Sequence, residues 1–177
     1  HKVVMTPGSH CYFDHYQSAP SGEPLAIGGY TPLEKVYSYE PVPSVLNEEE
    51  QSYIMGAQAN LWTEYILDEK QLEYMAMPRM AALAEVLWSP KEKKNETDFL
   101  NRLQTHFLLL DKLDVNYAKA LYKVEQKITA SSKPNTVVLE LIANASLGSI
   151  RYTSDGSMPT ATSEKYQSSI TLDKDIT

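Results

Sequence analysis

Two short stretches of the chain place a carboxylate two positions after an aromatic side chain. The pairs are Tyr12 with Asp14 and Trp62 with Glu64. In an extended backbone, residues i and i+2 point to the same face, so each ring would stand beside its own acid. A flat apolar wall next to a hydrogen-bond acceptor suits a sugar ring, which has CH groups on its face and hydroxyl groups on its rim. One such pair alone would indicate a core aromatic and a solvated charge, and the second pair favours a binding site.

Both pairs follow a segment with strand character. Residues 2–6 predict a short buried strand closed by a Pro-Gly turn, and residues 53–58 predict a second strand. A loop and a helix follow each strand, and this alternation predicts parallel strands with helices outside. Two such units are too few to cover a parallel sheet on both faces, so the pattern is typical of the last two units of a barrel.

Two of the expected helices carry clear boundary signals. Thr31 and Pro32 predict a short helix ending near Tyr39, with Thr31 as its N-cap and the proline at its first position. Residues 68–88 carry apolar side chains at helical spacing. Pro78 interrupts that stretch and predicts either a kink or a restart of the helix.

Further along, the sequence predicts another amphipathic helix capped by Thr97, and then a brief helical segment at residues 116–122. Arg79 and Glu85 lie near the apolar stripe of the preceding helix. They could be buried partners of one another, or charges on the helix surface, and the sequence leaves both alternatives open.

From about residue 125 the pattern changes to short strands. Residues 135–142 are rich in β-branched and apolar side chains, residues 149–154 alternate, and residues 166–172 predict one more strand. The expected organisation is therefore an α/β portion at residues 1–124 and a small β module at residues 125–177. The strands of this module are too few for a complete sandwich.

Composition excludes several classes of function. Of the 177 residues, 42% are hydrophobic, which is enough for a packed core, and the net charge of -7 argues against nucleic acid or an anionic membrane as the main partner. No apolar run is long enough for a membrane span. The single cysteine, Cys11, excludes an internal disulfide framework.

The segment that contains the first pair also carries residues of the types found in metal sites. His10, Cys11, Asp14 and His15 are residue types that bind zinc, but closely spaced ligands need a second pair elsewhere, and His106 lies inside a helical pattern. The sequence therefore predicts no metal and no cofactor.

Together the two pairs and their strands resemble glycoside hydrolase family 20, the β-N-acetylhexosaminidases. The first strand and its Tyr-x-Asp resemble the seventh strand of the family's barrel, and the second strand and its Trp-x-Glu resemble the eighth. The closing helix and a C-terminal β module of bacterial members are also similar to parts of this chain. The matching residues are 4–7 with 11–14, 56–58 with 61–64, 78–79 with 82–88, and 151–159.

The resemblance implies a fold, an activity and roles for four residues. It implies the C-terminal part of a (β/α)8 TIM barrel, followed by the β module. Enzymes of this family use the 2-acetamido oxygen of the substrate as the nucleophile and retain the anomeric configuration. Tyr12 would be catalytic by hydrogen-bonding the acetamide oxygen. Asp14 and Glu64 would accept hydrogen bonds from the sugar hydroxyls O4 and O6, and Trp62 would wall the pocket.

One part of the family's site has no counterpart at the expected place. The family has an adjacent Asp-Glu pair on an earlier strand, in which the acid that protonates the leaving group is the Glu. Asp68-Glu69 stands on a loop after the last strand, in the wrong context for that role. We therefore expect a piece of a longer enzyme that is inactive alone. A non-catalytic glycan-binding relative of the barrel is the alternative.

The remaining expectations concern partners and location. The expected partner is a glycan with a terminal N-acetylhexosamine, either N-acetylglucosamine or N-acetylgalactosamine. The chain opens at His1 without a signal peptide. The resemblance implies export of the whole protein to the periplasm, the cell surface or the medium. Open barrel edges predict self-association of the isolated chain.

Overall fold

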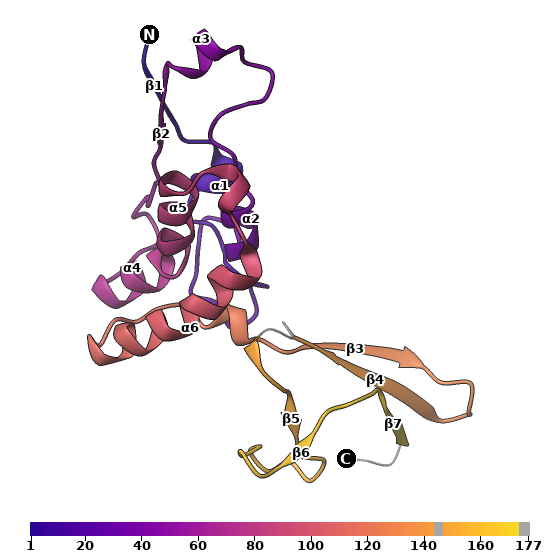
Figure 1. Cartoon of the computed structure of the whole chain (residues 1–177). Helices are drawn as coiled ribbons and strands as arrows, with labels where there is room; N and C mark the ends of the chain where they lie inside the picture. Colours follow the sequence, from indigo (N-terminus) through magenta and orange to yellow (C-terminus); the bar gives the residue numbers. More distant parts are fainter. Residues whose placement is uncertain (144–146, 174–177) are drawn as a thin grey trace. The chain divides into compact units, whose positions relative to one another are not determined.

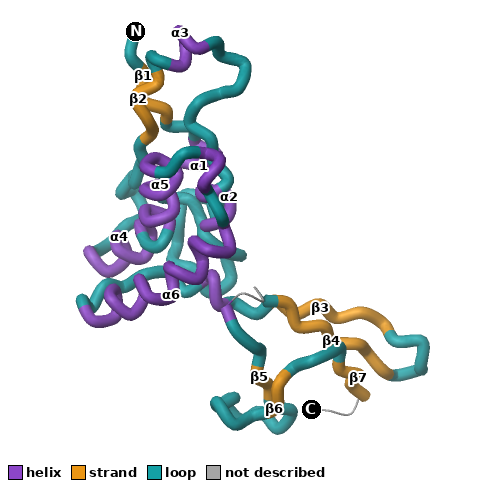
Figure 2. Tube along the Cα trace, in the orientation of Figure 1, coloured by secondary structure: helices purple, strands orange, loops and turns teal. Residues whose placement is uncertain are grey.

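The computed structural model describes residues 1–143 and 147–173. The chain forms two compact units, His1–Ala120 and Leu121–Thr177. Figure 1 follows the order of their elements along the chain, and Figure 2 separates the helices, strands and loops. The first unit holds both aromatic-acid pairs.

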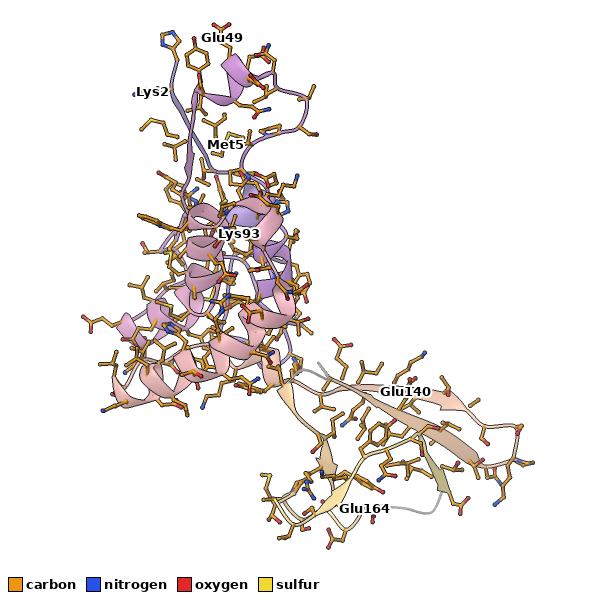
Figure 3. The ribbon with its side chains drawn as sticks, in the orientation of Figure 1. Lys2, Met5, Glu49, Lys93, Glu140 and Glu164 are labelled. Carbon is orange, nitrogen blue, oxygen red and sulfur yellow. The ribbon has the colours of Figure 1, made fainter. Side chains whose placement is uncertain are left out.

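A parallel strand pair forms the start of the first unit. Strand β1 (Val3–Met5) pairs with β2 (Ile54–Ala57), as the alternating pattern predicts. Val3 and Val4 keep 42% and 44% of their surface exposed, so the expectation of a buried strand is wrong. The reason is that, in the described part of the chain, β1 has one strand neighbour, β2. In Figure 3, Lys2 and Met5 mark this exposed part of the unit.

Short helices connect the strand pair to the rest of the unit. They are α1 (Gly8–Cys11), α2 (Leu33–Tyr37) and α3 (Glu48–Gln51). The N-cap of α2 is Pro32, not Thr31, and it makes no side-chain cap. The Thr31 hydroxyl instead hydrogen-bonds the His15 ring, so tertiary contact overrides the local capping signal. The N-terminus of α3 carries a capping box between Asn47 and Glu50.

The long helical stretch is divided at its proline. Helix α4 (Glu69–Ala76) ends before the cis peptide bond that joins Met77 to Pro78, and α5 (Arg79–Trp88) restarts directly after it. The predicted restart is confirmed. Proline has no N–H to offer to the preceding turn, and its ring blocks continuation of the helix. Asp68 caps α4 by accepting a hydrogen bond from the Gln71 N–H at 2.8 Å.

Helix α6 (Glu96–Lys112) supplies much of the core of the first unit. Its cap is Asn95, whose side-chain oxygen accepts from the Asp98 N–H, so the prediction of Thr97 as the cap is wrong by two positions. Asparagine caps as well as threonine does, and the apolar stripe alone does not decide between them. A 3-10 turn, η1 (Lys91–Lys93), precedes α6. The predicted segment at 116–122 is helical only in η2 (Ala120–Tyr122).

Aromatic stacking joins α6 to neighbouring segments. Phe99 stacks on Tyr37 of α2 with ring centroids 4.6 Å apart, and Phe107 stacks on Tyr117 at 4.4 Å. The buried side chains of α5 and α6 complete this core, namely Ala82, Leu83, Val86, Leu100, Leu103 and Leu110. No helix in residues 1–143 or 147–173 has both the length and the apolar character needed to cross a membrane.

The second unit is built from antiparallel strands. Strands β3 (Glu125–Ala130), β4 (Thr136–Ile142) and β7 (Ile170–Asp173) form one sheet in the order β3-β4-β7. Strands β5 (Arg151–Tyr152) and β6 (Glu164–Lys165) form a second, two-stranded sheet. The sequence predicts β4 well and misses β3, whose side chains are all exposed and show little apolar pattern. Glu140 and Glu164 mark the two sheets in Figure 3.

Candidate functional site

The backbone beyond the two strands brings the two aromatic-acid pairs together. Asn60 donates its N–H to the Cys11 carbonyl, and Phe13 donates its N–H to the Asn60 carbonyl, both at 2.8 Å. Tyr12 and Asn60 thus form an isolated parallel bridge beyond the ends of β1 and β2. Because parallel strands end at the same edge, the segments that follow them leave the sheet side by side.

Tyr12 and Trp62 lie next to each other at this edge. Their ring centroids are 6.4 Å apart with the planes inclined at 61°, an edge-to-face arrangement. Trp62 remains 52% exposed, while Tyr12 is half-buried. A half-open aromatic corner can offer an apolar face and a phenolic hydroxyl to one ligand.

The backbone at the two acids, Asp14 and Glu64, differs from the extended conformation that the sequence predicts. Phe13 and Asp14 lie in one turn, and Thr63 and Glu64 lie in another, where the Ile66 N–H donates to the Thr63 carbonyl at 3.3 Å. The assumption of an extended backbone at both pairs is therefore wrong, because each strand gives way to a turn before the acid is reached. Glu64 is exposed.

Asp14 is almost fully buried. It keeps only 7% of its surface, and its Oδ1 atom has no hydrogen-bond partner among the described residues. Buried carboxylate oxygens are costly unless they are paired, and they concentrate at functional positions. The Asp14 Oδ1 atom can therefore still accept a hydrogen bond.

His15 is a neighbour of Tyr12 that the sequence suggested only as a metal ligand. Its ring lies 5.7 Å from the ring of Tyr12, and its Nδ1 is 3.0 Å from the Thr31 hydroxyl. Burial lowers the pKa of His15 and so favours the neutral form of its imidazole. Gly29 has φ +69°, and a Cβ added to it would lie 2.6 Å from the His15 ring, so the close approach requires glycine there.

Comparison with known proteins assigns the chain that carries this site to a family. Residues 1–91 match the model of glycosyl hydrolase family 20, catalytic domain, and residues 119–177 match the chitobiase/beta-hexosaminidase C-terminal domain. The chain belongs to glycosyl hydrolase family 20. The resemblance expected from the two strand ends is confirmed, and so is the fold class of a barrel portion followed by a β module.

Individual family 20 proteins show the same similarity. The beta-hexosaminidase of Porphyromonas gingivalis is 49% identical over 118 residues, which is 66% of this chain and 15% of that protein. The beta-N-acetylhexosaminidase of Cellulomonas fimi is 33% identical over 114 residues, or 63% of this chain and 22% of that protein. The chain thus spans less than a quarter of the length of these relatives.

Solved family 20 structures match over the same portion. The exo beta-N-acetylglucosaminidase of Vibrio harveyi, in complex with N-acetylglucosamine, superimposes with a TM-score of 0.60 and 38% identity. The match covers 67% of this chain and 19% of that one. The beta-N-acetylhexosaminidase of Streptomyces coelicolor gives a TM-score of 0.59 at 25% identity, covering 67% and 24%.

In this family 20 chain, local structure accounts for the other polar residues that the sequence offered as candidates. Asp68 is the N-cap of α4, and Glu69 lies in the first turn of that helix. Burial raises the pKa of the Cys11 thiol to about 11, so Cys11 is not an activated nucleophile. Within residues 1–143 and 147–173, no group of three or more His, Cys, Asp or Glu side chains is placed to hold a metal ion.

The open alternatives for Arg79 and Glu85 are also settled. They are not partners of one another. Glu85 accepts hydrogen bonds from Arg102 and from the Tyr37 hydroxyl. Arg79 is fully buried and donates to main-chain carbonyls around the Tyr12–Asp14 turn, a contact that the sequence did not predict.

Proposed function

We propose that this chain is part of a retaining exo-β-N-acetylhexosaminidase that removes terminal N-acetylglucosamine or N-acetylgalactosamine. The observation that carries the proposal is the edge-to-face contact of Tyr12 with Trp62 at the ends of two parallel strands. Barrel enzymes place their chemistry at that end of the strands. The relatives named beta-hexosaminidase support the same class of substrate.

In the proposed reaction the acetamide oxygen of the substrate attacks the anomeric carbon. A bond forms between that oxygen and the carbon, while the glycosidic bond breaks and the leaving oxygen takes a proton from a general acid. Water then attacks the anomeric carbon, the bond from that carbon to the acetamide oxygen breaks, and the acetamide is restored. The group that served as the acid takes the proton of this water. Two displacements at one carbon retain its configuration.

Four side chains of this chain have proposed roles in that reaction. The Tyr12 hydroxyl donates a hydrogen bond to the acetamide oxygen and aligns it for attack. Trp62 supplies the wall against which the ring and the acetamide methyl pack. Asp14 and Glu64 accept hydrogen bonds from the hydroxyls O4 and O6, and the charge on each acid strengthens those bonds.

The general acid and the acid that orients the acetamide are proposed to lie outside these 177 residues. Asp68 and Glu69 are committed to the start of α4, which is not a strand end. On this proposal the chain holds the sugar but does not protonate the leaving group. It is expected to be inactive on its own.

The isolated chain is also proposed to self-associate. Strands β1 and β2 carry exposed apolar side chains, including Val3, Val4 and Met55. Unpaired strand edges of this kind template pairing with another chain. A monomer by light scattering would contradict this proposal, as would a Val4→Lys variant that associates as strongly as the wild type.

The experiment compares two aryl glycosides on the whole protein that contains this chain. One is an N-acetyl-β-glucosaminide, and the other is the matching β-glucoside, which has a hydroxyl in place of the acetamide. Turnover of the first alone is expected, because the acetamide is the nucleophile. Binding of N-acetylglucosamine without turnover would favour a non-catalytic glycan-binding protein. Equal turnover of both would refute acetamide participation.

A further inference from the structure

The Arg79 side chain is fully buried at the start of α5, and its guanidinium donates hydrogen bonds to main-chain carbonyls. Nη1 donates to the carbonyls of His15 and Thr31, each at 3.0 Å. Nη2 donates to the carbonyls of Phe13 and Met75 at 2.5 Å, and Nε donates to Met75 at 3.2 Å. One guanidinium thus joins the turn after α1, the segment before α2 and the end of α4.

Two of these carbonyls belong to the residues on either side of Asp14. The peptide groups of Phe13 and His15 are therefore fixed relative to Arg79, and the Asp14 side chain leaves the backbone between them. The guanidinium also lies over the Phe13 ring, 4.9 Å from its centroid. Arg79 is thus the side chain that fixes the two peptide groups flanking Asp14, in addition to the main-chain hydrogen bonds with Asn60.

Only arginine has the geometry for this arrangement. Its planar fork carries five N–H donors in fixed directions, whereas lysine offers three donors from one point on a flexible stem. A lysine at this position would keep the charge and lose contact with at least one of the three segments. That difference makes a conservative substitution informative.

Among the described residues, the buried charge of Arg79 has acidic neighbours but makes no direct ion pair. Burial lowers its pKa, and the negative charges of Glu23 and then of Asp14 act in the opposite direction. Glu23 is itself fixed, because its Oε1 accepts hydrogen bonds from the Ser18 and Tyr74 hydroxyls at 2.5 and 3.0 Å. Glu23 and Asp14 thus provide negative charge near the buried guanidinium of Arg79.

We propose that Arg79 is a positioning residue for the sugar-holding turn, setting the place of Tyr12 and Asp14 through the carbonyls of Phe13 and His15. The proposal rests on the proposed function of those two side chains. It predicts an effect on turnover that exceeds any effect on folding. A displacement of about 1 Å at a reacting group can cost roughly 100-fold in rate.

The experiment measures kcat and KM of Arg79→Lys in the whole protein, per folded molecule, with an N-acetyl-β-glucosaminide. We expect kcat to fall by roughly 100-fold with a smaller change in KM. The matched control is Tyr37→Phe, which removes buried hydrogen bonds to Glu85 and Asn95 in the same unit without touching the turn. Its kcat should stay at the wild-type value, whatever its loss of stability.

Phe13→Leu provides a second variant in case Arg79→Lys does not fold. It removes the ring under the guanidinium and leaves the main-chain carbonyls in place. We expect it to lower kcat by roughly threefold or more. Wild-type kcat in Phe13→Leu, and in Arg79→Lys where that variant folds, would overturn the positioning role. Absence of turnover in the wild type would instead refute the proposed function itself.

Discussion

The ring of Tyr12 meets the ring of Trp62 edge to face, 6.4 Å between centroids. Each residue follows a different strand of the parallel pair, and main-chain hydrogen bonds through Asn60 keep the two segments in register. The contact therefore depends on the backbone of both segments rather than on one loop.

Removing the Tyr12 hydroxyl should slow the chemical step. Tyr12→Phe keeps the ring contacts with Trp62 and His15. It loses only the hydroxyl that is proposed to donate to the acetamide oxygen. We expect kcat to fall by roughly 100- to 1,000-fold, the usual cost of one preorganised donor. Steady-state kinetics on an N-acetyl-β-glucosaminide measures this effect.

The matched control for that variant is Tyr16→Phe. The Tyr16 hydroxyl accepts a hydrogen bond from the Ala26 N–H at 3.3 Å, so the substitution costs a structural contact in the same segment. It should leave kcat unchanged. A Tyr12→Phe enzyme as fast as Tyr16→Phe would remove Tyr12 from the chemistry.

Removing the charge of Asp14 or Glu64 should weaken binding of the sugar hydroxyl groups. Asp14→Asn and Glu64→Gln keep the shape of each side chain and lose its charge. We expect kcat/KM to fall by roughly 10- to 100-fold in each case, because hydrogen bonds to charged acceptors contribute about 1.5–3 kcal/mol. Kinetics with 4-deoxy and 6-deoxy substrates assigns each acid to its hydroxyl.

The loss of kcat/KM in each variant should disappear with the deoxy substrate that lacks the hydroxyl bound by that acid. Asp98→Asn is the control, since Asp98 pairs with Arg102 on the exposed face of α6. The same penalty with every substrate, deoxy or not, would show that the acids act on the fold and not on the sugar.

Two buried tyrosines should respond with opposite signs when their hydroxyls are removed. The Tyr39 hydroxyl is buried without a hydrogen-bond partner among the described residues, so Tyr39→Phe should raise the free energy of unfolding by about 1 kcal/mol. The Tyr37 hydroxyl donates to Glu85 at 2.9 Å and accepts from the Asn95 N–H, so Tyr37→Phe should lower it by about 1–3 kcal/mol. Urea unfolding measures both variants, and a loss of stability in Tyr39→Phe would contradict the assignment.

Stability should fall in mild acid because of two histidines. Burial lowers the pKa of both His10 and His15 in the folded state. Above the unfolded pKa of about 6.5, both states hold neutral imidazoles, and the full stability is present. As the pH falls through the folded pKa values, the unfolded chain has already bound protons that the folded chain resists, so stability is lost.

The measurement compares the wild type with the double variant His10→Gln, His15→Gln. Urea unfolding at about pH 7.5 and about pH 5 should give a smaller loss of stability on acidification in the double variant. Equal losses in the two proteins would show that other groups cause the acid sensitivity.

The strands, the parallel pairing and the helix restart at Pro78 could be predicted because each depends on local sequence. Proline has the same effect wherever a helix meets it, and short apolar runs between turn residues indicate strands in any fold. The capping residues were less predictable. Thr31 is a good cap by type, but its hydroxyl binds His15, which lies far from it in the sequence.

The contacts of Arg79 with the turn that carries Tyr12 and Asp14 could not be predicted for a more basic reason. Arg79 binds main-chain carbonyls, and every residue has one, so no side-chain pattern identifies its partners. Similarly, a turn replaces the extended backbone after Trp62, and no residue between Trp62 and Glu64 is a strong turn signal. The sequence thus identified the side chains that are proposed to face the sugar and not the backbone contacts that hold them.

The most direct measurement is turnover of an N-acetyl-β-glucosaminide by Trp62→Ala in the whole protein, beside Trp88→Ala. Both tryptophans are exposed, at 52% and 89%, but only Trp62 contacts Tyr12. We predict that Trp62→Ala loses roughly 100-fold or more in kcat/KM while its melting temperature stays close to that of the wild type. Trp88→Ala should keep its activity. Wild-type turnover by a folded Trp62→Ala protein would contradict the proposal that the two strand ends hold the sugar.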